Sequence, residues 1–141
     1  MPRYIAITDI HGELRKLESV LSQIDIQPDD IFVFMGDYID RGHESRGVVD
    51  RIIQLAETNK CIYLIGSHEY ALLHAETDDY YQFLFDNYGG SATVKSYGSF
   101  ENIFKIHGDF YKSLKFYYKT DKYLFVHAGI NPDYPLEEQD E

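Results

Sequence analysis

Short apolar runs alternate with stretches of helical periodicity over the first half of the chain. Residues 4 to 8 (YIAIT) favour a strand, and residues 13 to 24 then place leucine, valine and isoleucine at helical spacing. The pair recurs with residues 31 to 35 (IFVFM) and a helix near 45 to 58, and again with residues 61 to 65 (CIYLI) and a helix in EYALLHA. Strands that alternate with helices predict an α/β fold with a largely parallel sheet.

The second half of the chain has a less regular pattern. Residues 78 to 115 are helical or irregular, with interruptions at YGG (88 to 90), Gly98 and Gly108. Strands at about 116 to 119 and 122 to 126, joined by TD, predict a hairpin. Because there is no repeat and no linker-like segment, we expect a single domain over residues 1 to 141. The lone Cys61 lies in an apolar run, where it is expected to be a small core residue.

Polar side chains with similar chemistry follow four apolar runs, namely the three described above and YLFV (123 to 126). The runs end in Asp9-Ile10-His11-Gly12, in Gly36-Asp37, in Gly66-Ser67-His68-Glu69 and in His127-Ala128-Gly129. Ligands of open α/β sheets bind at the C-terminal edge of the strands. Carboxylates and imidazoles gathered at this edge predict a metal site.

The donor types narrow the choice of metal. Asp9 and His11 are two residues apart, so on extended backbone their side chains point to one side and can bind one cation. A carboxylate with an imidazole suits Mn, Fe or Zn, and we expect Mn. Asp37 has two oxygens and can bridge two ions, which together would generate a hydroxide nucleophile for attack on phosphorus.

The segment GDYIDRG (36 to 42) adds an acid and a base. Arg41 is a planar donor suited to bidentate binding of phosphate. Asp40 can accept a hydrogen bond from an imidazole and hold it protonated. His68 is the expected imidazole, positioned as the general acid that protonates the leaving group.

Charge and hydropathy exclude two classes of partner. The formal net charge is −11 and lysine and arginine do not cluster, which argues against general nucleic-acid binding. The apolar run at the N-terminus is too short for a signal peptide or a membrane span. We therefore expect a cytoplasmic protein that binds neither nucleic acid nor membrane.

The motifs TDIHG, GDYIDRG, GSHE and HAG, in this order, resemble the phosphoprotein phosphatase branch of the calcineurin-like metallophosphoesterases. The likeness is greatest to bacterial and phage serine/threonine phosphatases and symmetrical diadenosine tetraphosphatases. NYGGSATVKSYG and the segment around HAG also resemble that group. The resemblance implies an αββα layered sandwich with mixed sheets and two metals between the sheets.

The resemblance also implies residue roles. Asp9 and His11 would bind the first metal, Asp37 would bridge, and His127 would bind the second metal. His68 would be the acid with Asp40 behind it, and Arg41 would bind phosphate.

Three departures from the family pattern are expected to weaken the site, two at the second metal and one in phosphate binding. Ser67 stands where the family has a metal-binding asparagine, and a serine hydroxyl is a weaker ligand. A later metal-binding histidine and a second phosphate-binding arginine belong to a C-terminal part that this sequence does not contain. We expect at most one tightly held metal per chain and turnover well below that of a full-length relative.

Several residues have simpler interpretations. Asp9, His11 and Asp37 could cap helices or turns, Ser67 could cap the helix that follows it, and Arg41 could form a surface ion pair. His127 could be a buried histidine. Of the other side chains, His43, His74 and His107 match no motif and are expected on the surface or in the core, and the tyrosines are expected to pack.

The function predicted from these features is a metal-dependent phosphoesterase that hydrolyses phosphomonoesters, phosphoprotein or dinucleoside polyphosphate through a metal-bound hydroxide. The alternative is a degenerate pseudo-phosphatase that acts as a binding or regulatory module. An unpaired sheet edge would also favour a strand-swapped or edge-paired homodimer.

Overall fold

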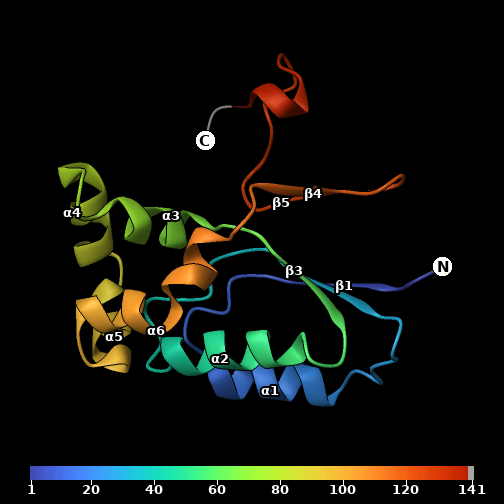
Figure 1. Ribbon diagram of the computed structural model, residues 1–141, viewed down its shortest axis with the longest axis horizontal. Coiled ribbons are helices and arrows are strands. Elements are labelled where there is room, and N and C mark those ends of the chain that lie inside the picture. The colour runs from blue at the N-terminus through green and yellow to red at the C-terminus, as the bar shows by residue number, and fades with distance from the viewer. Residues whose placement is uncertain (140–141) are drawn as a thin grey trace.

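The computed structural model describes residues 1–139 and places a parallel sheet between helices and a hairpin (Figure 1). Strands β1 (Tyr4–Ile7), β2 (Ile31–Phe34) and β3 (Lys60–Tyr63) lie side by side in this order. Their register places Ala6 beside Val33 and Val33 beside Ile62. The connections predicted by the alternating pattern are helices α1 (Leu14–Ser22) and α2 (Ser45–Leu55).

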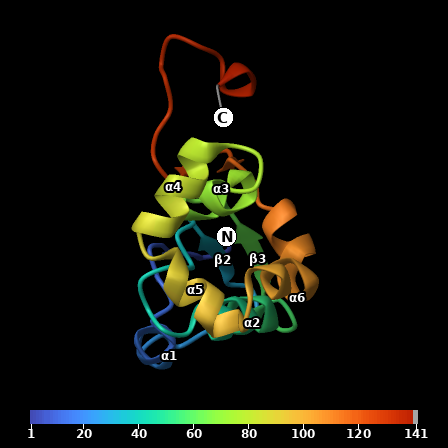
Figure 2. The same cartoon turned by 90° about the vertical axis from the view of Figure 1, so that its left-hand side faces the viewer.

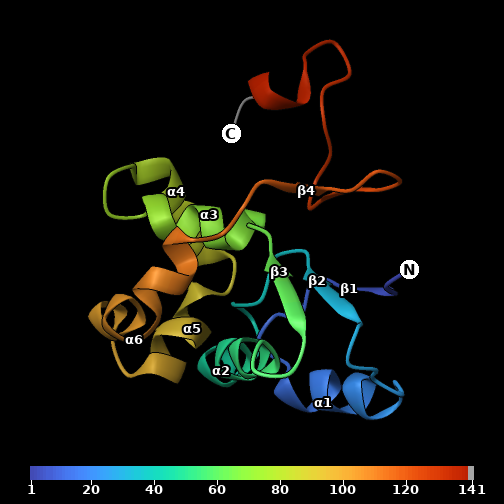
Figure 3. The same cartoon turned by 45° about the vertical axis from the view of Figure 1, so that its right-hand side comes forward.

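The two faces of β2 carry different parts of the core, since successive side chains of a strand alternate. Phe32 and Phe34 face the core shared with α1 and α2. Val33 belongs to a second cluster, which packs against Tyr118 and Phe125 of the hairpin. The hairpin consists of β4 (Tyr117–Lys119) and β5 (Leu124–Val126), which pair antiparallel. Figure 3 shows these layers in order, with α1 and α2 on one side of the sheet and β4 on the other.

Four further helices gather beyond the C-terminal ends of the strands (Figure 2). They are α3 (Ser67–His74), α4 (Asp79–Asn87), α5 (Gly90–Tyr97) and α6 (Phe100–Lys112). Asp78 caps α4 by accepting from the Tyr80 N–H, and Ser99 caps α6 by accepting from the Asn102 N–H. Helix α5 contacts α2, α4 and α6, so it joins this group to the helical face of the sheet. A short 3₁₀ turn, η1 (Leu136–Glu138), follows the hairpin.

The expected α/β class with mixed sheets is confirmed, with one parallel and one antiparallel sheet. The irregular stretch from 78 to 115 consists largely of helices α4, α5 and α6. The hairpin connection is longer than the predicted TD, because β5 begins at Leu124 and not at Lys122. Within residues 1–139, no helix is both long and apolar enough to cross a membrane.

Candidate metal centre

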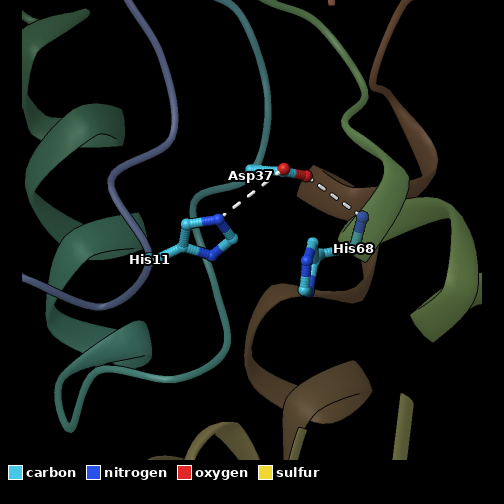
Figure 4. A group of neighbouring side chains, drawn as sticks. All are labelled: His11, Asp37 and His68. Carbon is cyan, nitrogen blue, oxygen red and sulfur yellow. Dashed lines mark hydrogen bonds and ion pairs between the residues drawn. The ribbon is translucent and has the colours of Figure 1, made fainter. Parts of the chain in front are cut away.

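The polar residues predicted at the strand ends converge in space. Asp9 and His11 follow β1, Asp37 follows β2, His68 follows β3 and His127 follows β5. Figure 4 shows His11 and His68 on either side of Asp37, with His11 and the His68 backbone N–H directed at its carboxylate. The centres of the His11 and His68 rings are 4.7 Å apart. One buried carboxylate is therefore the common neighbour of side chains from three strand ends.

The backbone at this edge is unusual. Asp9, His11, Asp37, Asp40 and Arg41 all have left-handed φ angles, between 46° and 73°, which non-glycine residues seldom adopt. The loops are held against each other by backbone hydrogen bonds, such as those from Asp9 N–H to Gly36 O and from His11 N–H to Asp37 O, both 3.0 Å. The assumption of extended backbone at Asp9 and His11 is thus wrong, although the two side chains do meet at 3.8 Å.

Two histidines present their Nε2 atoms to Asp37. His11 Nδ1–H donates to the carbonyl oxygen of Ile39 at 2.8 Å, and His127 Nδ1–H donates to that of Met35 at 2.7 Å. The Nε2 atoms then lie 3.7 Å and 3.3 Å from Asp37 Oδ2. A backbone carbonyl that fixes the far ring nitrogen is the usual support of a metal-binding histidine. The chemistry of these donors fits a divalent metal.

The donors form two overlapping groups that share Asp37. One consists of His11, Asp37 and His68, and the other of Asp9, Asp37 and His127, with the donor atoms of each group within 4.8 Å of one another. Mixed nitrogen and oxygen donors suit Mn, Fe or Zn better than Mg or Ca. Asp9 belongs to the group with His127, and its Oδ1 also lies 3.8 Å from His11 Nε2. The resemblance placed Asp9 at the first metal alone, together with His11.

In the protein without metal, Asp37 and His127 each stabilise the charged form of the other. Burial alone would raise the pKa of Asp37, but the hydrogen bond from His127, the His68 N–H and the nearby positive charges lower this pKa to about 2. The same contact with Asp37 raises the pKa of His127 to about 9, against the opposing effect of burial. A metal ion that binds His127 must therefore displace a proton.

His68 and Asp40 form the predicted acid pair. His68 Nδ1 lies 2.7 Å from Asp40 Oδ2, and the Asp40 side chain is only 2% exposed. This hydrogen bond raises the pKa of His68, while burial opposes it. With Nδ1 occupied by Asp40, the proton available to a substrate is the one on Nε2.

Arg41 is exposed at the rim of a cleft of about 480 Å³, which Asp9, His11 and Gly42 also line. The arginine ion pairs formed within residues 1–139 involve Arg3, Arg46 and Arg51. The alternative of a surface ion pair at Arg41 is therefore wrong for the described part of the chain. The guanidinium is left available to a ligand in the cleft.

The helix-capping alternatives are also wrong, although His11 does lie in a turn. The residues at the N-caps of α1 and α2 are Glu13 and Glu44, not Asp9 or Asp37. Helix α3 begins at Ser67 itself, with Gly66 at its N-cap. The Ser67 hydroxyl lies 3.5 Å from Asp37 Oδ1, so it is next to the candidate metal ligands.

Glu69 supports the site and was not assigned a role from the sequence. Its carboxylate accepts the N–H groups of Asp37 (2.6 Å), Tyr38 (3.0 Å) and Gly66 (3.0 Å), and the residue is fully buried. Burial and the charge of Asp37 raise the pKa of Glu69 to about 7, against these three hydrogen bonds. Its position in GSHE was the only sequence signal for this role.

The histidines outside the motifs lie away from the centre, as expected. His43 is exposed, and His74 Nδ1–H donates to the Tyr70 carbonyl in α3. His107 is buried in α6. None of the three belongs to either donor group within residues 1–139.

Comparisons with known proteins agree with this geometry. The sequence profile of the calcineurin-like phosphoesterases matches residues 2–140. Bis(5'-nucleosyl)-tetraphosphatase PrpE (asymmetrical) of Anoxybacillus flavithermus is 30% identical over 152 residues, which cover 93% of this chain and 59% of the relative. Its name specifies the asymmetrical type, whereas the sequence resemblance was to symmetrical enzymes.

Two further comparisons extend the likeness. The serine/threonine-protein phosphatase 6 catalytic subunit of Caenorhabditis elegans is 28% identical over 127 residues, covering 89% of this chain and 35% of the relative. The crystal structure of a cold-active protein-tyrosine phosphatase from a psychrophilic Shewanella superposes with a TM-score of 0.70 at 22% identity, covering 94% of this chain and 44% of that one. The chain spans less than two thirds of the length of each of these proteins. Because the family profile matches nearly the whole sequence, the chain belongs to the calcineurin-like phosphoesterase family.

Proposed function

We propose that the chain provides the metal-binding and acid-base parts of a metal-dependent phosphoesterase. The observation that carries the proposal is the convergence of His11 Nε2 and His127 Nε2 on one buried carboxylate, Asp37, with each far ring nitrogen bound to a backbone carbonyl. A structural carboxylate would not need two imidazoles oriented in this way. The family membership supports the same chemistry.

The proposed roles follow from position. Asp9, His11, Asp37 and His127 would hold divalent metal, with Ser67 as a weak additional ligand. A metal ion held there would polarise the phosphate and lower the pKa of a coordinated water. Arg41 at the cleft rim would bind phosphate oxygens, and His68 would give its Nε2 proton to the leaving-group oxygen while Asp40 holds Nδ1.

The identity of the metal, the substrate classes and the cellular location are further parts of this proposal. Mn is the expected metal, with Fe and Zn as alternatives, because all three suit donors that mix imidazole nitrogen with carboxylate oxygen. Phosphomonoesters, phosphoprotein and dinucleoside polyphosphates are the expected substrate classes, and the names of the curated relatives include enzymes of the last two kinds. The cytoplasmic location stays a prediction from the sequence.

An edge-paired homodimer is proposed for the same chain. Strand β1 is an edge strand of the three-stranded sheet formed within residues 1–139. Unpaired edges favour pairing with another strand. Sedimentation equilibrium over a range of concentrations would test this, and a monomer throughout would overturn it.

The test of function is turnover of p-nitrophenyl phosphate after removal and return of metal. We expect the protein to be inactive after the metal is removed with a chelator, and added Mn to restore turnover. Asp37→Asn should lower kcat/KM by about 100-fold or more, since even the outer partners of metal ligands contribute 10–100-fold. The matched control is Asp86→Asn, an exposed carboxylate on α4, which should keep the wild-type rate.

Two results would contradict the proposal. Turnover that does not depend on metal, or that survives Asp37→Asn, would remove the assigned centre from the chemistry. Mn binding without hydrolysis of p-nitrophenyl phosphate, a phosphopeptide or diadenosine tetraphosphate would instead identify a binding module.

A further inference from the structure

A group of buried hydroxyls lies behind the Asp40–His68 pair. Thr93 Oγ1, on α5, donates to Asp40 Oδ1 at 2.6 Å, and it accepts from the Asp40 backbone N–H at 2.9 Å. Ser45 Oγ lies 3.0 Å from Thr93 Oγ1 and also accepts from the Asp40 N–H, at 3.1 Å. Thr93 and Ser45 have no exposed surface, and Asp40 is 1% exposed. The carboxylate of Asp40 is thus enclosed by polar atoms of the protein.

The two oxygens of Asp40 have separate partners. Oδ2 binds the His68 ring nitrogen at 2.7 Å, and Oδ1 binds the Thr93 hydroxyl at 2.6 Å. With both oxygens and the N–H of Asp40 engaged, the carboxylate has one orientation in which all three contacts are made. Loss of the Thr93 hydroxyl would leave Oδ1 buried without this donor, and the carboxylate could turn away from His68.

Helix α5 is itself fixed against the loop that carries Asp40. The Arg41 N–H donates to Gly89 O at 3.1 Å at the start of the helix, and the Arg46 N–H donates to Ser96 Oγ at 2.9 Å near its end. One turn after Thr93, the Tyr97 hydroxyl lies 2.6 Å from His107 Nδ1 and 2.8 Å from the Tyr111 hydroxyl. These contacts hold Thr93 at a fixed position relative to Asp40.

We propose that Thr93 is a positioning residue for the general acid, acting through Asp40 on His68. This inference rests on the proposed phosphoesterase function and assigns a role to the segment NYGGSATVKSYG, which the function leaves unexplained. The hydroxyl holds the carboxylate, the carboxylate holds Nδ1–H of the imidazole, and the Nε2 proton then points toward the leaving-group oxygen. On transfer, the proton moves from Nε2 to the ester oxygen, and a neutral ring remains with its proton on Nδ1.

Leaving-group dependence tests this role directly. A general acid assists a poor leaving group more than a good one, so its misplacement should affect phenyl phosphate more than p-nitrophenyl phosphate. We expect Thr93→Val, of equal shape but without the hydroxyl, to lower kcat about tenfold or more for phenyl phosphate and less than about threefold for p-nitrophenyl phosphate. Thr93→Ser, which retains the hydroxyl, should stay within about threefold of the wild type for both substrates.

The matched control is Ser91→Ala, which removes an exposed hydroxyl from the same helix and should keep the wild-type ratio of the two rates. Thr93→Ala provides the same comparison should the valine variant not fold. Equal losses for both substrates in the variant without the hydroxyl, or no loss, would overturn the proposal, because a merely structural role does not distinguish leaving groups.

A second measurement separates this inference from the proposed function. Two-bond ¹H–¹⁵N NMR spectra of the metal-free protein, recorded at alkaline pH, report which ring nitrogen of His68 carries the proton. We expect Nδ1–H in the wild type and in Thr93→Ser, and a mixture of both tautomers in Thr93→Val. An unchanged tautomer in Thr93→Val would overturn the positioning role even for a chain without phosphatase activity.

Discussion

Gly66 lies so close to Asp37 that its lack of a side chain is part of the site. A Cβ atom at this position would be 2.3 Å from both the N and the Oδ1 atoms of Asp37. Both of these atoms are engaged, since Asp37 N–H donates to Glu69 and Oδ1 accepts from the His68 N–H. Real Cβ atoms do not approach so closely, so a side chain at Gly66 must displace Asp37.

We therefore expect Gly66→Ala to lower the free energy of unfolding by about 2 kcal/mol or more, in the range of overpacked or disrupted buried sites. The matched control is Gly108→Ala in α6, where the nearest atom to an added Cβ is 3.6 Å away. That variant should be neutral or more stable by up to about 1 kcal/mol. Urea unfolding monitored by circular dichroism measures both, and equal stabilities of the two variants would contradict the steric account.

Helix α6 changes direction at a buried histidine. His107 has non-helical backbone angles (φ −127°, ψ 17°), and its ring is held by the Tyr97 hydroxyl on Nδ1 and by Asp50 on Nε2, at 2.6 Å and 2.8 Å. Burial lowers the pKa of His107, although Asp50 opposes this effect. The folded protein therefore favours the neutral ring more than the unfolded chain does.

The sign of the pH effect follows from this shift. The unfolded chain takes up a proton near the ordinary histidine pKa of about 6.5, whereas folded His107 does so only at lower pH. The contribution of His107 to stability is complete above about pH 6.5 and is lost as the pH falls toward the folded pKa. The unfolding free energy should decrease less between pH 7.5 and 5.5 in His107→Gln than in the wild type, with the exposed His43→Gln as control. The same decrease in all three proteins would contradict this account.

The elements that follow hydrophobic periodicity could be predicted from the sequence. The three parallel strands and helices α1 and α2 lie where apolar spacing indicates, because their buried positions repeat at the period of a strand or a helix. Helices α4 and α5 meet at YGG, where Gly89 has a left-handed φ of 104°. The glycines interrupt the apolar spacing here, so the two short helices on either side of them were not distinguished from the sequence.

The convergence of polar residues at the strand ends could also be predicted, because parallel strands bring their C-terminal ends together. The residues concerned are Asp9, His11, Asp37, His68 and His127. The sequence could not predict which atoms of these side chains lie in contact. The left-handed backbone at the site depends on hydrogen bonds between loops far apart in sequence. The contact between Thr93 and Asp40 spans 53 positions and leaves no local pattern.

At the scale of the whole molecule, the layers bring strand ends from both sheets to the same edge. His127 comes from the antiparallel hairpin, whereas the other donors come from the parallel sheet. Packing of Tyr118 and Phe125 against Val33 and its neighbours positions the hairpin over that sheet. The second donor group, which contains His127, therefore depends on the contact between the two sheets.

The central claim is that this shared edge holds metal through Asp37. With His68 reserved as the acid, four side chains remain, enough for one full set of ligands: Asp9, His11, Asp37 and His127. Inductively coupled plasma mass spectrometry after Mn loading and exhaustive dialysis should find about one Mn ion per chain in the wild type and almost none in Asp37→Asn. Ser67→Asn should raise this content. No retained Mn in the wild type, or equal Mn in the wild type and Asp37→Asn, would contradict the claim.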